Sequence, residues 1–365
     1  MSRTILLDAP NVGVLEKKYL SAAIDSTYIS TIGPLVPKFE EKFARFLGAK
    51  GAVSTQSGTA AIHVALHELG IASGDEVIVP ALTFAASVNP VIYVGVKPVF
   101  VDVDPKTWNM DPLAVEKKIT KRTKAILAVH LYGNPCDMGK IMAIARRHKL
   151  FVIEDATESL GAAYRGRLTG TIGDLGCFSF NGNKIITTGG GGMVIGKDQA
   201  RLAHIKFLVN QARDGMRGYY HPEVGFNYRM TNLEAAVGLA QMKRLEKFLR
   251  VKKEFYQIYR NELKGVSDVR FQKEYPHARS SWWLTALVLD SAVPVEPIVK
   301  KLNAKGIQAR RIFMPVVEFP YLGRFNAREF KNSYRIYDRG LCLPGSTLNT
   351  KDDILTVCRT LKGAL

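Results

Sequence analysis

One lysine lies between two apolar runs and is followed by four consecutive glycines. The segment FSFNGNKIITTGGGGMVIG covers residues 178–196, with Lys184 in its polar middle and Gly189 to Gly192 behind it. An amine enclosed by apolar strands loses the solvation of its charged form. Its pKa therefore falls, and it becomes a nucleophile that can form a Schiff base with a carbonyl. Taken alone, the segment is equally compatible with a surface hairpin that carries a solvated lysine.

Three other segments carry groups suited to a flat, anionic cofactor. In TQSGTAAIH, Gly58 and Thr59 follow Ser57 at the expected start of a helix, where free N–H groups favour a phosphate, although such residues also cap helices that bind nothing. Asp155 ends the apolar run FVIED and could pair with a cationic ligand atom or cap the next helix. Phe84 could stack on a ring or pack in the core. Together with the lysine, these groups match the requirements of pyridoxal 5'-phosphate, PLP.

Apolar runs in the first 200 residues predict the strands that position these groups. They alternate with helical patterns such as 138–149, which is typical of repeated βαβ units and a mostly parallel sheet buried on both faces. Ligands gather at the carboxyl ends of such strands. The fold class is therefore α/β. The expected strands are 76–80, 97–103, 125–131, 151–155, 176–180 and 192–196.

The last part of the chain predicts a second, smaller unit. A capping box at Thr231 and Glu234 starts a helical pattern, so we expect one long helix over 232–263. We expect this helix to join a large domain, residues 1–245, to a small α+β domain, residues 246–365. The small domain should contain a strand within 281–290, a helix within 295–307 and a helix after residue 350.

The charge of the chain raises the question of a nucleic-acid partner. The formal net charge is +18, but Lys and Arg are spread from end to end and accompany no DNA- or RNA-binding motif. A solvated basic surface or a polyanionic small molecule is the better explanation. Because no apolar run has the length of a membrane span or a signal peptide, we expect a cytoplasmic protein without nucleic-acid or membrane partners. The four scattered cysteines suggest no metal site.

Several longer motifs give the chain a specific resemblance. QSGTAAIH, EDATESLG, FSFNGNKIITTGGGGMV and GFNYRMTNLEAAVGLAQ resemble the motifs of the DegT/StrS family of PLP-dependent nucleotide-sugar aminotransferases, and the similarity extends from residue 28 to residue 354. The resemblance implies fold type I, in which a large domain with a mostly parallel sheet is followed by a small α+β C-terminal domain. It also implies a homodimer whose active sites are shared between subunits.

The resemblance also implies roles for individual residues. Lys184 would bind PLP as a Schiff base, and Asp155 would pair with the nitrogen of its ring. Phe84 would lie against the ring, and Glu158 would stand near the ring hydroxyl, where many relatives have Gln. The remaining implied contacts are Gly58, Thr59 and Ser179 to the phosphate and Asn227 to the phosphate of the neighbouring subunit's cofactor.

The implied reaction moves an amino group from glutamate to a nucleotide-linked keto sugar, with pyridoxamine 5'-phosphate as the intermediate form of the cofactor. The acceptor would be the 4-keto group of a 4-keto-6-deoxy sugar used for bacterial surface glycans such as lipopolysaccharide. LCLPGSTLNTKDDI favours UDP-4-keto-6-deoxy-N-acetylglucosamine, the precursor of bacillosamine- and legionaminic-type sugars. HLYGNPCDM and SSWWLTALVLD resemble the GDP-perosamine synthases nearly as well.

Other interpretations concern the basic residues and the class of protein. Arg213, Arg310 and Arg311 could contact the substrate diphosphate, or they could be ordinary surface or interdomain arginines. Relatives that dehydrate sugars replace the lysine with histidine, whereas Lys184 is present here. A non-enzymatic, PLP-sensing protein that binds nucleic acid is the alternative from another class, but the chain leaves no room for a DNA-reading module.

Overall fold

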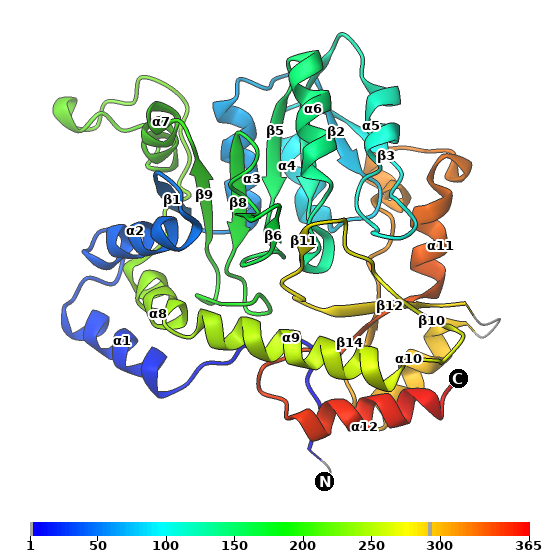
Figure 1. Cartoon of the computed structure of the whole chain (residues 1–365). Helices are drawn as coiled ribbons and strands as arrows, with labels where there is room; N and C mark the ends of the chain where they lie inside the picture. Colours follow the sequence, from blue (N-terminus) through cyan, green and yellow to red (C-terminus); the bar gives the residue numbers. More distant parts are fainter. Residues whose placement is uncertain (1–2, 291–293) are drawn as a thin grey trace.

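Continuous apolar runs form a seven-stranded central sheet. The computed structural model describes residues 3–290 and 294–365, and Figure 1 shows the sheet between two sets of helices. Strand β9 runs antiparallel to β1 and β8, and the neighbouring pairs from β8 to β3 are parallel. The predicted α/β class with a mostly parallel sheet is therefore confirmed. In sheet order, the strands are β1 (Ala52–Thr55), β9 (Gly192–Gly196), β8 (Leu175–Ser179), β5 (Phe151–Asp155), β4 (Thr123–Val129), β2 (Glu76–Pro80) and β3 (Lys97–Val101).

Helices cover both faces of this sheet because successive strand residues point to opposite sides. In β4, Ala125 and Leu127 pack with one set of helices, whereas Ile126 and Ala128 pack with the other. The first set is α3 (Gly58–Glu68), α4 (Ala85–Tyr93) and α7 (Gln199–Val209), and the second is α5 (Pro112–Lys118) and α6 (Met138–His148). The carboxyl ends of the strands are thereby left free to build a site.

A second, antiparallel sheet has its own apolar core. Its strands, in order, are β10 (Val269–Phe271), β12 (Thr285–Leu289), β14 (Gly340–Leu343) and β13 (Arg310–Arg311). Helices α9 (Leu245–Glu262), α10 (Val295–Ala304) and α12 (Lys351–Lys362) pack around it. This is the expected α+β unit, and its boundary at residue 245 stays a prediction. Ile5, near the N-terminus, also pairs with Ile307 here.

The other elements connect and cover the two sheets. Helices α1 (Val14–Asp25) and α2 (Leu35–Leu47) pack against α8 (Asn232–Met242). Within the described ranges, no helix is both long and apolar enough to cross a membrane. The short elements are β6 (Ala163–Tyr164), β7 (Arg167–Leu168), β11 (Ala278–Arg279), α11 (Lys331–Arg339) and the 3-10 helices η1 (Leu131–Gly133), η2 (Gly215–Arg217), η3 (Val316–Glu318), η4 (Pro320–Leu322) and η5 (Ala327–Phe330).

The single long helix expected over 232–263 is wrong. Helix α8 ends at Met242 and α9 begins at Leu245, because the N–H groups between them donate to carbonyls three residues back, at 3.1 and 2.8 Å. From this turn the guanidinium of Arg244 reaches Glu16, with Nη1 to Oε1 at 3.0 Å. The ion pair between Arg244 and Glu16 of the N-terminal segment thus stabilises the turn between α8 and α9. Apolar spacing cannot reveal such a contact, because the periodic pattern continues across it.

Helix α9 carries a buried lysine that joins two segments near the site. The Lys252 ammonium donates to the backbone oxygens of Trp283 and Gly345, both at 2.9 Å. Burial lowers the pKa of Lys252 to about 8. A neutral amine retains two N–H donors, which suffice for the two carbonyls. The contact is therefore kept when the charge is lost.

We expect Lys252 to give the stability of the fold a distinct pH dependence. Its folded pKa, about 8, lies below the ordinary value of 10.5, so the unfolded chain binds the extra proton between these values. The cost of burying the charge is then relieved as the pH rises. Relative to Lys252→Met, the wild-type free energy of unfolding should increase by about 3 kcal/mol across this window. Denaturant unfolding at several pH values measures this difference, and a flat difference would contradict the assignment.

Candidate active site

A cavity of about 310 Å³ opens at the carboxyl ends of the central strands. Its wall includes the ends of β4, β5 and β8, the first turn of α3, and residues from the second sheet. The site is therefore built between the two sheets. The predicted site residues that line it are Gly58, Thr59, Phe84, Asp155, Glu158, Ser179, Lys184 and Arg310.

Lys184 is enclosed in this cavity, and the solvated surface hairpin is not observed. Its Nζ lies 4.1 Å from the centre of the Trp283 ring and 3.8 Å from Oε1 of Glu158. Burial lowers the pKa of Lys184, and the charges of Glu158 and Asp155 oppose this shift. The amine is therefore easier to deprotonate than an exposed lysine, as a nucleophile or a general base requires.

Glu158 is a buried carboxyl group aimed at this amine. Its Oε2 accepts a hydrogen bond from the backbone N–H of Tyr132 at 2.8 Å, which fixes the side chain. Burial raises the pKa of Glu158, while the charge of Lys184 and the Tyr132 N–H oppose the rise. The neutral carboxylic acid can donate a hydrogen bond, as the amide of Gln can. This geometry suits a contact to a ring hydroxyl.

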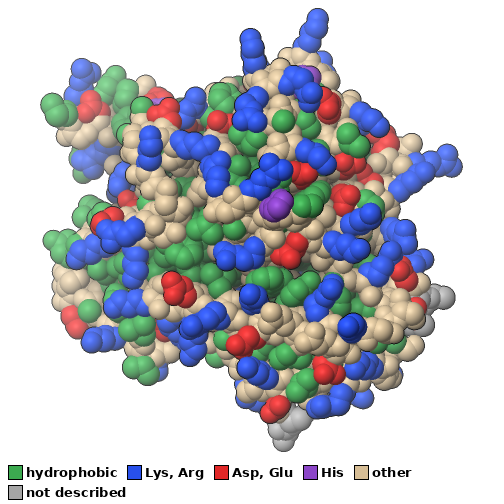
Figure 2. All heavy atoms as spheres, in the orientation of Figure 1, with side chains coloured by type: hydrophobic (Ala, Val, Ile, Leu, Met, Phe, Trp, Pro, Cys, Tyr) green, Lys and Arg blue, Asp and Glu red, His purple; other side chains and the backbone are tan. Residues whose placement is uncertain are grey.

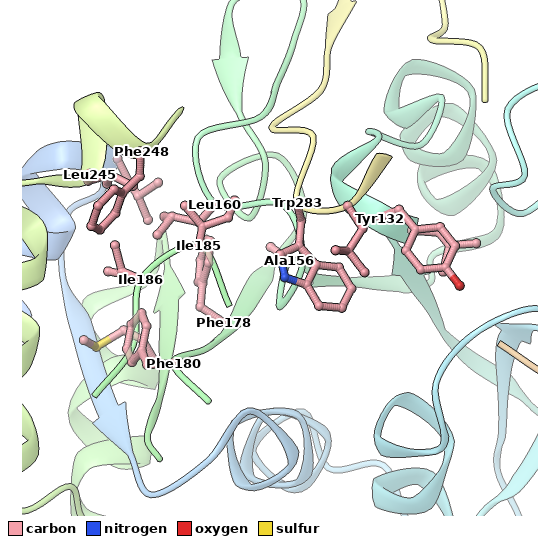
Figure 3. Close-up of a cluster of buried hydrophobic side chains, with 14 of the residues drawn as sticks. Tyr132, Ala156, Leu160, Phe178, Phe180, Ile185, Ile186, Leu245, Phe248 and Trp283 are labelled. Atoms are coloured by element: carbon pink, nitrogen blue, oxygen red, sulfur yellow. The ribbon is translucent and has the colours of Figure 1, made fainter. Parts of the chain in front are cut away.

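Trp283 supports the lysine and was missed as a site residue from the sequence. Its Nε1 donates to the backbone oxygen of Asn183 at 2.6 Å, and its ring stacks on Tyr132 at a centroid distance of 6.1 Å. Figure 3 shows Trp283 beside Ala156, between Leu160 and Tyr132 in the large apolar cluster. In the sequence this tryptophan could only be read as part of an apolar strand.

The first turn of α3 fits a phosphate. Ser57 caps the helix by accepting from the Ala60 N–H at 3.0 Å. A Cβ on Gly58 would stand 2.8 Å from Cβ of Ser179 and 3.0 Å from the methyl of Thr157. Only glycine allows this close approach, which puts the serine hydroxyl beside the positive end of the helix.

Asp155 is held by neutral donors. Its Oδ2 accepts from the Ser87 hydroxyl at 2.6 Å, and its Oδ1 accepts from the Thr157 N–H at 3.1 Å. No Lys, Arg or His within 3–290 and 294–365 forms an ion pair with it. A buried carboxylate that lines the cavity without a cationic partner fits the protonated nitrogen of a pyridine ring. Ser87 is a second residue that sequence reasoning missed.

The last two glycines of the run, Gly191 and Gly192, are required by contacts inside the chain. A Cβ on Gly192 would stand 2.4 Å from the carbonyl oxygen of Ser57, and Gly191 has φ +89°. The N–H of Gly191 donates to the oxygen of Gln56 at 2.8 Å. The strand that follows Lys184 is thus pressed against the segment that leads into the phosphate cup.

Some predicted residues do not line this cavity. Asn227 and Arg213 are exposed, and Nε of Arg213 donates to the oxygen of Gly218 at 3.0 Å. The guanidinium of Arg311 packs over Tyr337 at 4.0 Å from the ring centre. The structure therefore gives no support for Arg311 as a substrate contact.

Comparison with known proteins identifies the family. The sequence pattern of the DegT/DnrJ/EryC1/StrS aminotransferase family matches residues 10–362. The chain belongs to this family. It is 42% identical to the GDP-perosamine synthase of Caulobacter vibrioides over 99% of this chain and 98% of that protein. It is 38% identical to the UDP-2-acetamido-2-deoxy-3-oxo-D-glucuronate aminotransferase of Pseudomonas aeruginosa over 64% of this chain and 65% of that protein.

Solved structures agree with this result. The PLP form of Spr1654 from Streptococcus pneumoniae superimposes with a TM-score of 0.94, at 25% identity, and the match covers 99% of this chain and 98% of that one. The protein is accordingly a PLP-dependent sugar aminotransferase with the type I fold. PLP is its cofactor, and the phosphate cup, Asp155 and Lys184 fit it.

We expect the charge of Glu158 to control the reactivity of Lys184. Glu158→Gln removes the charge that raises the pKa of Lys184, so in protein stripped of cofactor the amine should become neutral at lower pH. Acetylation with acetic anhydride across a pH series, followed by peptide mass spectrometry, reads out this shift at position 184. Glu76→Gln, remote from the cavity, serves as the control. A reactivity curve that stays in place or moves to higher pH would refute the coupling.

Proposed function

We propose that the protein transfers the amino group of glutamate to the 4-keto group of a nucleotide-linked 4-keto-6-deoxy sugar. The observation that carries this proposal is the desolvated amine of Lys184, set between an indole and a carboxyl group in a cavity that also fits a phosphate. The product would serve bacterial surface glycans such as lipopolysaccharide, and the enzyme would act in the cytoplasm. The alternative of a non-enzymatic nucleic-acid-binding protein is set aside, because the chain belongs to an enzyme family.

In this proposal the predicted cofactor-binding residues that line the cavity divide the work. When bound, PLP supplies an aldehyde and an electron-accepting ring. Lys184 holds the cofactor covalently and, once displaced by the donor, moves the proton at the donor's α-carbon. Asp155 keeps the ring nitrogen protonated, and Phe84, whose exposed side chain lines the cavity, lies against the ring. The residues proposed to hold the phosphate are Gly58, Thr59 and Ser179.

Burial explains how Lys184 serves as a proton carrier. A general base must be neutral when it accepts a proton, and the environment of Lys184 favours the neutral amine. Glu158 lies 3.8 Å away and can stabilise the ammonium that then forms. Lys184 can therefore take up a proton at its Nζ and release it again, because neither its neutral nor its charged form is strongly disfavoured in the site.

We also propose a homodimer with shared sites. Residues 213–224 form an arm that stands clear of the body at the upper left of Figures 1 and 2, while Phe226 and Tyr228 at its base pack against the core. Met216 and Tyr219 on this arm are 96% and 83% exposed, which is costly for apolar side chains in water. Such an arm could bring Arg213 and Asn227 to the site of a second copy. The basic residues do not mark a second contact surface in this view, because Figure 2 shows Lys and Arg scattered over this face among acidic residues.

Two nucleotide sugars are candidates for the acceptor, and we favour the UDP-linked one. The C-terminal motif LCLPGSTLNTKDDI supports UDP-4-keto-6-deoxy-N-acetylglucosamine as the acceptor. GDP-4-keto-6-deoxymannose is the second candidate, and full-length similarity to the Caulobacter vibrioides GDP-perosamine synthase favours it. Both sugars carry the same 4-keto group and a diphosphate, so the proposed chemistry is common to them.

We expect the holoenzyme to aminate one sugar of a UDP-, GDP- and dTDP-keto sugar panel with glutamate as donor. Mass spectrometry should detect the exchange of a keto oxygen for an amino group. The visible absorbance band of the bound cofactor should shift when glutamate is added to wild type, and this shift should be absent in Lys184→Ala. The kcat of Lys184→Ala should be lower by at least about a thousandfold. The exposed Lys50→Ala is the control. A Lys184→Ala protein that still aminates sugars at the wild-type rate would refute the proposal.

A further inference from the structure

We infer that Arg310 binds the α-carboxylate of the amino donor and thereby selects α-amino acids for the first half of the reaction. This inference rests on the proposed function and names the contact by which the same cavity recognises its donor. Arg310 comes from β13 in the second sheet, yet it lines the cavity of the central sheet.

The guanidinium of Arg310 has unused hydrogen-bond donors. Its Nε and Nη2 are buried and have no hydrogen-bond partner in the described part of the chain. No carboxylate of residues 3–290 or 294–365 lies within ion-pair distance of it, although Glu158 and Asp8 are in its wider surroundings. Buried guanidinium nitrogens without a hydrogen-bond partner are costly unless they bind an anion. The geometry therefore indicates an anionic ligand.

The polar groups nearest to Arg310 are neutral. Burial raises the pKa of the Cys342 thiol to about 12 and raises that of the Tyr132 hydroxyl well above its usual value. Neither group supplies a negative charge at neutral pH. The other neighbours are aromatic, because the guanidinium carbon lies 5.2 Å from the ring centre of Phe313 and 6.0 Å from that of Trp283. This apolar frame strengthens an ion pair with a ligand.

The position of Arg310 distinguishes a carboxylate from a diphosphate. Lys184 and Arg310 lie against the same indole, that of Trp283, and they are the cations among the described residues that line the cavity. An α-amino acid carries its carboxylate on the carbon that bears the amino group. Its amino group can therefore react at the position of the Lys184 amine while its carboxylate binds Arg310. In the sugar, the diphosphate is attached across the ring from the 4-keto carbon and points away when that carbon reaches the amine. The planar fork of guanidinium also matches a carboxylate in two hydrogen bonds.

The neighbouring arginine offers a matched control. Successive strand residues point to opposite sides, and the Arg311 guanidinium packs on Tyr337 and lies 3.8 Å from Asp338, outside the cavity. Arg311→Met removes the same charge from the same strand. Arg310→Met removes the charge from the cavity while keeping an apolar side chain against Phe313.

The two half-reactions of the holoenzyme test the inference separately. We expect Arg310→Met to lower kcat/KM for glutamate by about 30- to 100-fold. Amination of the keto sugar by the pyridoxamine phosphate-loaded protein should stay within about threefold of wild type. Arg310→Lys should recover part of the loss, and Arg311→Met should change neither half-reaction. Melting temperatures establish that each variant is folded.

Calorimetric titration with 2-oxoglutarate gives a readout besides activity. Arg310→Met should weaken the binding of 2-oxoglutarate to the PLP-loaded protein by about the same 30- to 100-fold as it lowers kcat/KM for glutamate. Arg311→Met should leave this binding unchanged. Loss confined to the keto-sugar half-reaction would overturn the inference and indicate a diphosphate contact. Equal losses in both half-reactions would overturn it in favour of a packing role. Wild-type protein that binds 2-oxoglutarate through Arg310 but aminates no keto sugar would refute the proposed function while supporting the carboxylate contact.

Discussion

The site depends on one constraint, which is that a lysine amine must stay desolvated in the cavity without a hydrogen-bonded ion pair that would keep it protonated. Glu158 stands 3.8 Å from Lys184, near enough to attract its charge, and burial shifts both groups toward their neutral forms. The Trp283 ring stabilises the ammonium without supplying a proton acceptor. The amine can therefore exist in either state, as reversible carbonyl chemistry requires.

The two sheets divide the work of meeting this constraint. In the central sheet, strand β5 ends at Asp155 and strand β8 ends at Ser179, and the neighbouring helix α3 turns its positive N-terminus toward the cavity. The second sheet and the segments around it supply Trp283 and Arg310. Lys252 holds the second unit together beside the cavity, because its ammonium donates to the backbone oxygens of Trp283 and Gly345. The cavity is thus formed only when both units are folded and in contact.

Much of this arrangement could be predicted from the sequence. Buried parallel strands leave continuous apolar runs, so the central sheet and the strand-end position of Asp155 were predictable, and motif similarity indicated Lys184 and its cofactor. Features set by distant contacts were not. The break before α9 is held by Arg244 and Glu16, which are far apart in the chain. Trp283 became recognisable as a site residue only when the fold brought it to the lysine, and Arg310 and Arg311 could not be told apart before their opposite sides were known.

The central claim is that Lys184 binds the cofactor covalently. Borohydride reduction of the PLP-loaded protein, followed by proteolysis and mass spectrometry, tests it most directly. The account predicts a pyridoxyl mass on the peptide that carries residue 184. A reduced protein with no such mass there, or with the label on a different buried lysine such as Lys252, would contradict it.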